Sequence, residues 1–266
     1  MEDLVLIKLG GSVITDKSKP LTPRMDAIRR LGKELLQARK ISKAKMVLAH
    51  GQGSYAHIPA AKYKTQLGNI NKNSIKGFSV VADMATWPNR ILVKEFVGLG
   101  IPAVSFSPLS FVYSKNQKLE SVFTKQIEKA LEIGITPVIY GDVIMDEKMG
   151  FCIYSGEKTL DLLALRLSKK YKIEKIVMAG DTDGVYDESG KTIAEITSKN
   201  FSIIKSALGG SKSTDVTGGM LHKVEESLSL AKKGIFSVII NGAKSGELYK
   251  VLVGKSHRGT EIRHKP

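Results

Sequence analysis

A glycine-rich turn with a histidine at each end is the segment of this chain best suited to binding an anion. The turn runs from His50 to His57 and follows the apolar stretch Met46 to Ala49. Glycines let backbone N–H groups approach an anion closely, and a histidine adds a donor that can carry positive charge. Taken alone, the segment fits an ordinary polar turn equally well, so its chemistry depends on which other segments lie beside it.

Residues of the same kind follow other apolar stretches. Lys8 lies inside one such stretch, which leads into Gly10-Gly11-Ser12; Asp181 follows another, and Gly219 opens an expected helix that carries Lys223. A lysine in an apolar strand is rarely buried without a partner, and a glycine-rich helix N-terminus suits phosphate. Each fragment alone could be a tight turn, an acidic loop or a helix cap, but their common place at strand ends predicts one phosphate site.

The elements that must position these residues alternate along the chain. Short apolar segments alternate with amphipathic, helical periodicity, which predicts a mainly parallel sheet with helices on both faces. The expected strands are Leu4 to Leu9, Met46 to Ala49, Ile101 to Phe106, Thr136 to Tyr140, Ile176 to Ala179 and Ile235 to Asn241.

Three helices are expected between these strands. The first has Thr22 as its N-cap and Pro23 at its first position, because these residue types favour a helix start. It places Ile28, Leu31, Leu35 and Leu36 on one face, and the other two helices span Leu160 to Lys170 and Gly219 to Lys233. Residues 64–76 and 205–219 are rich in polar residues and glycine and are expected to be loops.

Composition limits the class of protein. The 266 residues carry 41 Lys and Arg against 26 Asp and Glu, and the excess of +15 is spread along the chain as a solvated surface would be. No apolar run reaches the roughly 18 residues of a membrane span, and no signal peptide is apparent, so a cytoplasmic location is expected. Cys152 is the only cysteine, and the acidic segment at Asp181 lacks the distal glutamate of a calcium loop, so no metal site built from side chains is expected.

In this order, the segments resemble the motifs of the amino acid kinase superfamily, and within it the isopentenyl phosphate kinases. The resemblance covers nearly the whole chain. Its matching segments are Lys8-Leu9-Gly10-Gly11-Ser12-Val13-Ile14-Thr15-Asp16-Lys17, His50-Gly51-Gln52-Gly53-Ser54-Tyr55-Ala56-His57, Tyr154-Ser155-Gly156, Asp183-Gly184-Val185-Tyr186, Asp215-Val216-Thr217-Gly218-Gly219 and Gly259-Thr260.

The resemblance implies an α/β fold of a particular kind. This is a three-layer αβα sandwich with a central, mainly parallel sheet, formed as a single domain over residues 1–266. Residues 1–160 would form the acceptor-binding and dimerisation half, and residues 161–266 the nucleotide-binding half. A homodimer is implied as well.

The resemblance also implies a reaction. The γ-phosphoryl group of ATP would move to the phosphate of isopentenyl phosphate, with dimethylallyl phosphate as a second candidate acceptor, to form a diphosphate in isoprenoid biosynthesis. Because the acceptor oxygen is already anionic near neutral pH, the chemical task is to hold two anions in line and neutralise the charge between them. Mg²⁺ would be held mostly by phosphate oxygens, with no set of protein ligands.

Residue roles follow from the same resemblance. The implied catalytic residues are Lys8, Lys17, His57 and Lys223, with His57 on the acceptor phosphate and the lysines around the transferred group. The implied nucleotide-binding residues are Lys8, Gly10, Gly11, Ser12, Gln52, Asp181, Tyr186, Gly218, Gly219 and Lys223. The implied acceptor-binding residues are Gly51, Ala56, His57 and Gly156.

The chain departs from the family pattern at the acceptor turn and after Gly156. Gln52 and Ala56 stand where the family has glycines, which adds side chains where backbone would approach phosphate. Glu157 and Lys158 stand where the family has two aspartates. These departures predict a narrower or reoriented acceptor site, and they leave open whether Glu157 organises the lysines.

An isoprenoid chain would also need an apolar pocket. The segment after His57 carries a stripe of large apolar residues, which fits ordinary core or the wall of such a pocket. Its members are Ile58, Ile75, Phe78, Val81, Met84 and Trp87.

Two alternatives remain open. A phosphonate kinase, or a kinase of another small acid, could use the same scaffold, although a histidine in the acceptor turn favours phosphate or phosphonate over carboxylate. A nucleotide-binding or nucleic-acid-binding regulator without catalysis ranks lower, because all three lysines are present. The preferred interpretation therefore has a small-molecule phosphate substrate and neither a nucleic-acid nor a membrane partner.

Overall fold

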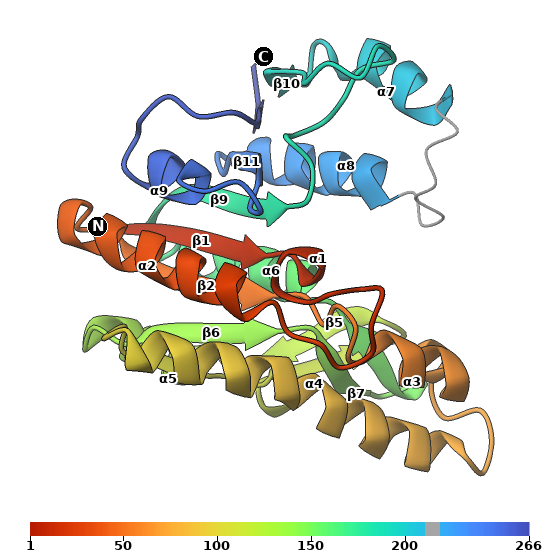
Figure 1. The fold of residues 1–266 in the computed structure, drawn as a ribbon. Coiled ribbons are helices and arrows are strands. Elements are labelled where there is room, and N and C mark those ends of the chain that lie inside the picture. Colours follow the sequence, from red (N-terminus) through yellow and green to blue (C-terminus); the bar gives the residue numbers. More distant parts are fainter. Residues whose placement is uncertain (211–218, 266) are drawn as a thin grey trace.

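In the computed structural model, which describes residues 1–210 and 219–265, eight strands form a central sheet (Figure 1). Adjacent strands run parallel except β11 and β12, which are antiparallel. The strands, in spatial order, are β10 (Glu195–Thr197), β12 (Thr260–Arg263), β11 (Ser237–Asn241), β9 (Lys172–Gly180), β1 (Asp3–Leu9), β2 (Lys45–His50), β6 (Thr136–Tyr140) and β3 (Ala103–Ser105). The predicted mainly parallel sheet is confirmed.

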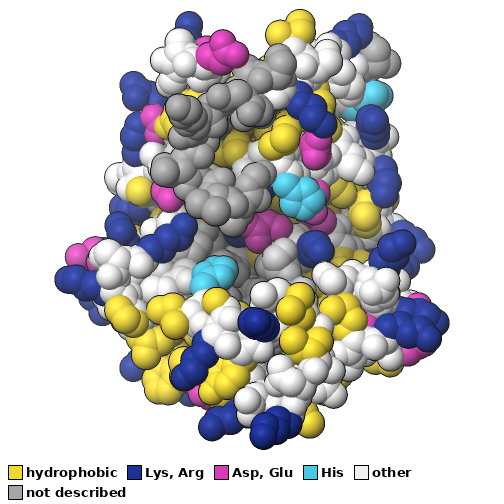
Figure 2. Space-filling model, turned by 90° about the vertical axis from the view of Figure 1, so that its right-hand side faces the viewer, with side chains coloured by type: hydrophobic (Ala, Val, Ile, Leu, Met, Phe, Trp, Pro, Cys, Tyr) yellow, Lys and Arg dark blue, Asp and Glu magenta, His cyan; other side chains and the backbone are white. Residues whose placement is uncertain are grey.

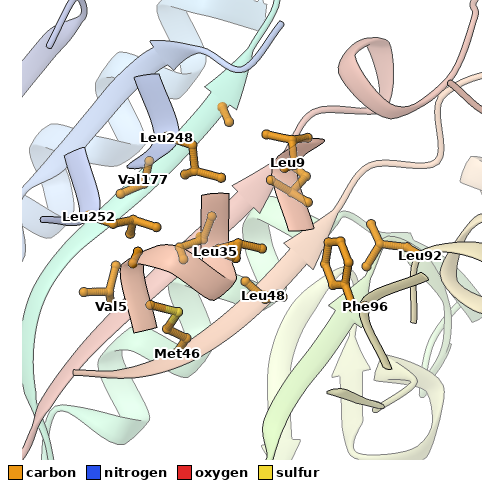
Figure 3. Close-up of a cluster of buried hydrophobic side chains, with 14 of the residues drawn as sticks. Val5, Leu9, Leu35, Met46, Leu48, Leu92, Phe96, Val177, Leu248 and Leu252 are labelled. Atoms are coloured by element: carbon orange, nitrogen blue, oxygen red, sulfur yellow. The ribbon is translucent and has the colours of Figure 1, made fainter. Parts of the chain in front are cut away.

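Helices cover both faces of this sheet because its central strands are apolar on both sides. Alternate β1 residues point to opposite faces: Val5, Ile7 and Leu9 pack in one core cluster, and Leu4 and Leu6 in another. The first cluster, drawn in Figure 3, lies under α2 (Met25–Ile41), α4 (Ser74–Gly98) and α9 (Glu247–Leu252). On the opposite face lie α5 (Lys125–Glu132), α6 (Gly156–Leu167) and α8 (Gly219–Ala231). The three-layer αβα sandwich is therefore confirmed.

A second, smaller sheet was not expected from the sequence. It consists of β5 (Lys118–Val122), β4 (Val112–Lys115), β7 (Asp142–Asp146) and β8 (Gly150–Tyr154), in that order. Its apolar side chains pack with α5 and α6 in the second core cluster. The short elements are α1 (Gly11–Ile14), α3 (His57–Tyr63), η1 (Thr65–Leu67), η2 (Pro108–Ser110) and α7 (Phe201–Gly210). Among the described residues, no helix is both long and apolar enough to cross a membrane.

The expected start of α2 was wrong. The helix begins at Met25 with Arg24 as its N-cap residue, so neither Thr22 nor Pro23 has the predicted role. Pro23 instead forms an isolated bridge with Thr15, which closes the loop of turns between these two residues.

The two expected loops are also partly structured. Residues 64–76 include η1 and the first turn of α4, and α7 extends to Gly210, inside the expected loop at 205–219. Several strand ends differ by a few residues from the expected ones: β3 and β11 begin later than their apolar runs, whereas β2 and β9 extend beyond the expected bounds. The segment 211–218 lies outside the described residues.

A buried carboxylate joins the two turns of the small sheet. Asp146, at the end of β7, accepts hydrogen bonds from Met149 N at 2.9 Å and Gln117 N at 2.8 Å, and also from Asn116 N and Ser114 Oγ. Asn116 and Gln117 both have positive φ angles, as a tight hairpin turn requires. Burial alone would raise the pKa of Asp146, but these donors outweigh burial and hold its pKa well below 3.8.

We predict that Asp146→Asn destabilises the protein by about 2 kcal/mol at pH 7, because an amide nitrogen would face donors that now bond to an oxygen. A carboxyl group with a lowered folded-state pKa stabilises the fold above its unfolded-state pKa of 3.8 and loses that effect as the pH falls. The difference from the wild type should therefore narrow below about pH 4 in denaturant titrations. Exposed Asp83 supplies the control, Asp83→Asn. A difference that is constant from pH 7 to pH 3 would contradict this role.

Candidate functional site

The described structure has a large cavity at the carboxyl ends of the central strands, where ligands of parallel sheets usually bind. Its volume is about 810 Å³. Figure 2 looks onto this edge and shows a hollow with basic, acidic and histidine side chains around it. The residues of the sequence-predicted site that line the cavity are Lys8, Gly10, Gly11, Ser12, Lys17, Gly51, Gln52, Ala56, His57, Gly156, Asp181, Gly219 and Lys223.

Two glycine turns meet at backbone distance in the floor of this cavity. A Cβ atom at Gly11 would lie 2.5 Å from Gly53 N, and one at Gly53, where φ is +53°, would lie 1.9 Å from Thr15 Oγ1. The buried Thr15 hydroxyl donates to Gly11 O at 2.8 Å and accepts from Ser54 N at 3.0 Å. The turn after β1 and the turn after β2 are therefore fixed against each other, and only glycines permit this approach.

Lys8 has the partner that its place in an apolar strand requires. Its ammonium group donates a hydrogen bond to Glu157 Oε1, and the two side chains are 12% and 23% exposed. Glu157 lies in the first turn of α6, whose N-cap residue Ser155 accepts from Lys158 N at 3.1 Å. Burial alone would raise the pKa of Glu157, but the ammonium groups of Lys8 and Lys223 outweigh burial and lower it. This carboxylate therefore stays charged, in contact with Lys8 and under the influence of the charge on Lys223.

His57 begins α3 at the rim of the same cavity. Partial burial of the ring and the nearby ammonium group of Lys17 lower the pKa of His57, whereas Glu157 acts in the opposite direction. An anion bound at the cavity would add to the effect of Glu157 and favour the charged imidazolium. The position and the chemistry of His57 therefore suit binding of a phosphate group.

The other histidine of the turn, His50, is a structural residue. His50 is fully buried at the end of β2, stacks on the Tyr140 ring with centroids 5.7 Å apart, and lies 3.1 Å through Nε2 from Asn89 Nδ2. Burial lowers the pKa of His50 to about 4, so the ring is neutral at physiological pH. His50 is therefore a neutral residue of the core, whereas His57 lines the cavity.

Gln52 fills space that a glycine would leave open. Its Nε2 atom donates to Gly141 O and ties the acceptor turn to the β6–β7 junction, while its buried Oε1 atom has no partner among the described residues. The carbon skeleton of Gln52 also lies close to Gly141, at 3.8 Å from the position of a Cβ atom there. Together with Ala56, it narrows the cavity relative to a turn with glycines at these two positions.

One end of the cavity is apolar. It is lined by Ala60 from α3, Val81 and Ala85 from α4, and Ile153 from β8. Of the apolar stripe predicted from the sequence, only Val81 lines the cavity, while Phe78 and Met84 pack behind it. The remaining members of the stripe are exposed: Ile58 at 60%, Ile75 at 66% and Trp87 at 54%.

Two of the expected nucleotide-binding residues are not placed at the cavity. Tyr186 is not among its lining residues; the Tyr186 hydroxyl accepts a hydrogen bond from Asp183 N at 2.9 Å in the loop after β9. Gly218 lies outside the described residues. Sequence reasoning assigned no role to Asp142, which is buried and lines the cavity. Its place in the sequence, an acidic residue shortly after the apolar strand β6, could have indicated it.

Comparison with known proteins agrees with this geometry. The family model described as "Amino acid kinase family" matches residues 3–241. The chain belongs to the amino acid kinase family.

Two curated relatives of this kinase are named isopentenyl phosphate kinase. The one from Methanothermobacter thermautotrophicus is 33% identical over 98% of this chain and 100% of its own length. The one from Methanocaldococcus jannaschii is 35% identical over 97% of this chain and 98% of its own length. A solved structure described as an isopentenyl phosphate kinase is 28% identical and aligns with a TM-score of 0.81 over 97% of this chain and all of its own.

We predict that Glu157→Gln lowers kcat for phosphoryl transfer by about tenfold or more and raises KM for ATP, because the amide leaves Lys8 without its counter-charge. Steady-state kinetics at saturating acceptor measure both constants. Lys158→Gln, at the exposed neighbouring position, is the matched control and should have little effect. Glu157→Asp, which restores the family residue, should recover part of the activity; equal loss in the Gln and Asp variants would argue against a charge role.

Proposed function

We propose that this kinase transfers the γ-phosphoryl group of ATP to isopentenyl phosphate, and also to dimethylallyl phosphate, to form the diphosphates. The observation that carries the proposal is a single cavity with two chemically different ends. Lysines and glycine backbone surround one part, and small apolar side chains between α3 and α4 line the other. A phosphate with a short hydrocarbon tail has the same two parts, and relatives that share the full length of the chain are named for this substrate.

The chain's own residues supply the charge that this reaction needs. Lys8, Lys17 and Lys223 line one cavity and would surround the transferred phosphoryl group, while the backbone N–H group of Gly11 would contact a nucleotide phosphate. The N–H group of Gly10 is already engaged, because it donates to Ala179 O at 2.8 Å. Because the acceptor oxygen is already anionic, no strong general base is required. The catalytic contribution of these residues is to hold both anions in line and offset their repulsion.

Mg²⁺ is proposed to arrive with the nucleotide. Among the described residues, no group of three or more His, Cys, Asp or Glu side chains is arranged to hold a metal ion. This fits a cation coordinated mainly by phosphate oxygens and water, with at most one or two carboxylates from the protein. When bound, the ion would neutralise charge on the phosphates.

The assignment of separate roles to the two halves of the chain is part of the same proposal. Residues 1–160 contribute His57 and the apolar end, and residues 161–266 contribute Asp181, Gly219 and Lys223. We therefore assign acceptor binding and dimerisation to the first half and nucleotide binding to the second. A cytoplasmic homodimer without a nucleic-acid partner completes the proposal.

The acceptor is tested by offering isopentenyl phosphate, dimethylallyl phosphate, a small phosphonate and glutamate in parallel and measuring ATP consumption and product. We expect turnover with the two isoprenoid phosphates at a kcat/KM at least about a hundredfold above the others, because only they fill both ends of the cavity. Preferred turnover of the phosphonate would replace the proposal with a phosphonate kinase. ATP-independent, salt-sensitive binding of nucleic acid without any turnover would replace it with a regulatory role.

We predict that His57→Ala lowers kcat/KM for the acceptor by about a hundredfold and leaves ATP affinity within about twofold, because the ring contacts only the acceptor phosphate. The deficit should grow as the pH falls below 6.5, since the protonated ring is the form that binds phosphate. Acceptor kinetics and calorimetric ATP titrations at several pH values measure the two effects. His264→Ala, at an exposed position outside the cavity, is the control. Loss of ATP binding alone in His57→Ala would contradict the acceptor role.

A further inference from the structure

A second, much smaller space adjoins the phosphate cavity between α6 and α8. Its volume is about 10 Å³, the scale of one water molecule. Lys8, Glu157 and Lys223 line both spaces. Asp161 and Glu226 line only the smaller one, so two further carboxyl groups lie directly behind the residues that surround the phosphates.

Helical spacing links these two carboxyl groups to the phosphate site. Asp161 follows Glu157 by four residues on α6, and Glu226 follows Lys223 by three residues on α8. Residues at these spacings share one helix face. Each helix therefore presents one charged group to the phosphate cavity and, one turn later, a carboxyl group to the facing helix.

The charges around Asp161 are unbalanced. Glu157 is engaged by Lys8, and Glu226 Oε1 lies 3.1 Å from His222 Nε2. The charges that shift the pKa of Asp161 are the carboxylates of Glu226 and Glu157, and no ion pair or hydrogen bond to the Asp161 side chain is found among the described residues. Two adjacent carboxylates that are both ionised repel each other, and one proton between them removes the repulsion.

The other elements packed around the small space add few charges. β9 presents the apolar side chains of Ile176 and Met178, β1 presents Lys8, which contacts Glu157, and α8 presents Lys223 and the buried hydroxyl group of Ser227. Lys158, on the same helix, is exposed. Burial, followed by the charges of Glu226 and Glu157, raises the pKa of Asp161 to about 7.

We propose that Asp161 is a positioning residue: its protonated carboxyl group hydrogen-bonds toward Glu226 across the water-sized space that both residues line, and so sets the spacing of α6 and α8 that holds Lys8 and Lys223 around one nucleotide phosphate. Loss of the proton to solvent leaves two facing carboxylates, whose repulsion separates the helices and weakens ATP binding. The inference rests on the proposed function only in that these lysines bind ATP; it is independent of the acceptor.

The first test is stability against pH and needs no substrate. Asp161→Asn keeps a donor and cannot ionise, so it mimics the protonated residue. A raised folded-state pKa means that the wild type loses stability as the pH rises from 3.8, the unfolded-state value, to about 7. The melting temperature of Asp161→Asn should therefore exceed that of the wild type by an amount that grows from pH 4.5 to about 7 and then levels off. A constant difference across this range would overturn the proposal.

The second test separates positioning from simple packing. The Kd for ATP with Mg²⁺, measured by calorimetry from pH 5.5 to 8.5, should rise about fivefold or more in the wild type relative to Asp161→Asn as the pH passes 7. Asp161→Leu fills the same space without a donor and should bind ATP weakly at every pH. Equal Kd values for the Asn and Leu variants would show that only volume matters, and would overturn the role of the proton.

Two further variants complete the design. Glu226→Gln removes the facing charge, so the pH step in ATP affinity should move to lower pH. Asp83→Asn, at an exposed position on α4, should follow the wild type throughout. If the protein turns over none of the offered acceptors but the melting-temperature step is present, the proposed function fails and the role of Asp161 in the helix pair stands.

Discussion

The site depends on a positive charge placed inside the central strand of a buried sheet. Lys8 belongs to β1, which has neighbours on both sides and apolar residues above and below. An ammonium group there is costly unless a carboxylate compensates it, and Glu157 supplies that carboxylate from the first turn of α6. Because the pair joins a strand to a helix, the lysine is held at the carboxyl end of the sheet with little freedom. A nucleotide phosphate can then bind to an ammonium group whose position the fold already fixes.

Close backbone packing provides the second constraint. The turns after β1 and β2 approach so closely that Gly11 and Gly53 admit no side chain, and Thr15 hydrogen-bonds to both turns. Two loops from adjacent strands thereby form one rigid floor of the cavity. Gln52 reaches from the second of these turns to Gly141 O and also lines the cavity, so its side chain affects the shape of the cavity.

Much of this arrangement follows from the sequence. Continuous apolar runs such as that of β1 predict strands buried on both faces, and glycines after them predict the anion site. The elements that the sequence did not predict correctly have weaker or conflicting sequence patterns. The strands of the small sheet are short, and β5 among them has no buried residue. The start of α2 has good capping residues in Thr22 and Pro23, but pairing of Pro23 with Thr15 overrides them. The local preference of residues for a helix start or a strand amounts to well under a few kcal/mol, so such tertiary contacts can override it.

The sequence by itself determined the layered α/β fold and the family, because periodicity and glycine placement are local properties that survive without coordinates. It also identified the lysines and His57 as one group. Only the tertiary structure decided their partners: that Glu157 pairs with Lys8 near the charge of Lys223, and that Asp161 and Glu226 line one small space between two helices. The physical reason is that charge pairing and pKa depend on distance and burial between residues far apart in the chain, and spacing along a sequence does not encode either quantity.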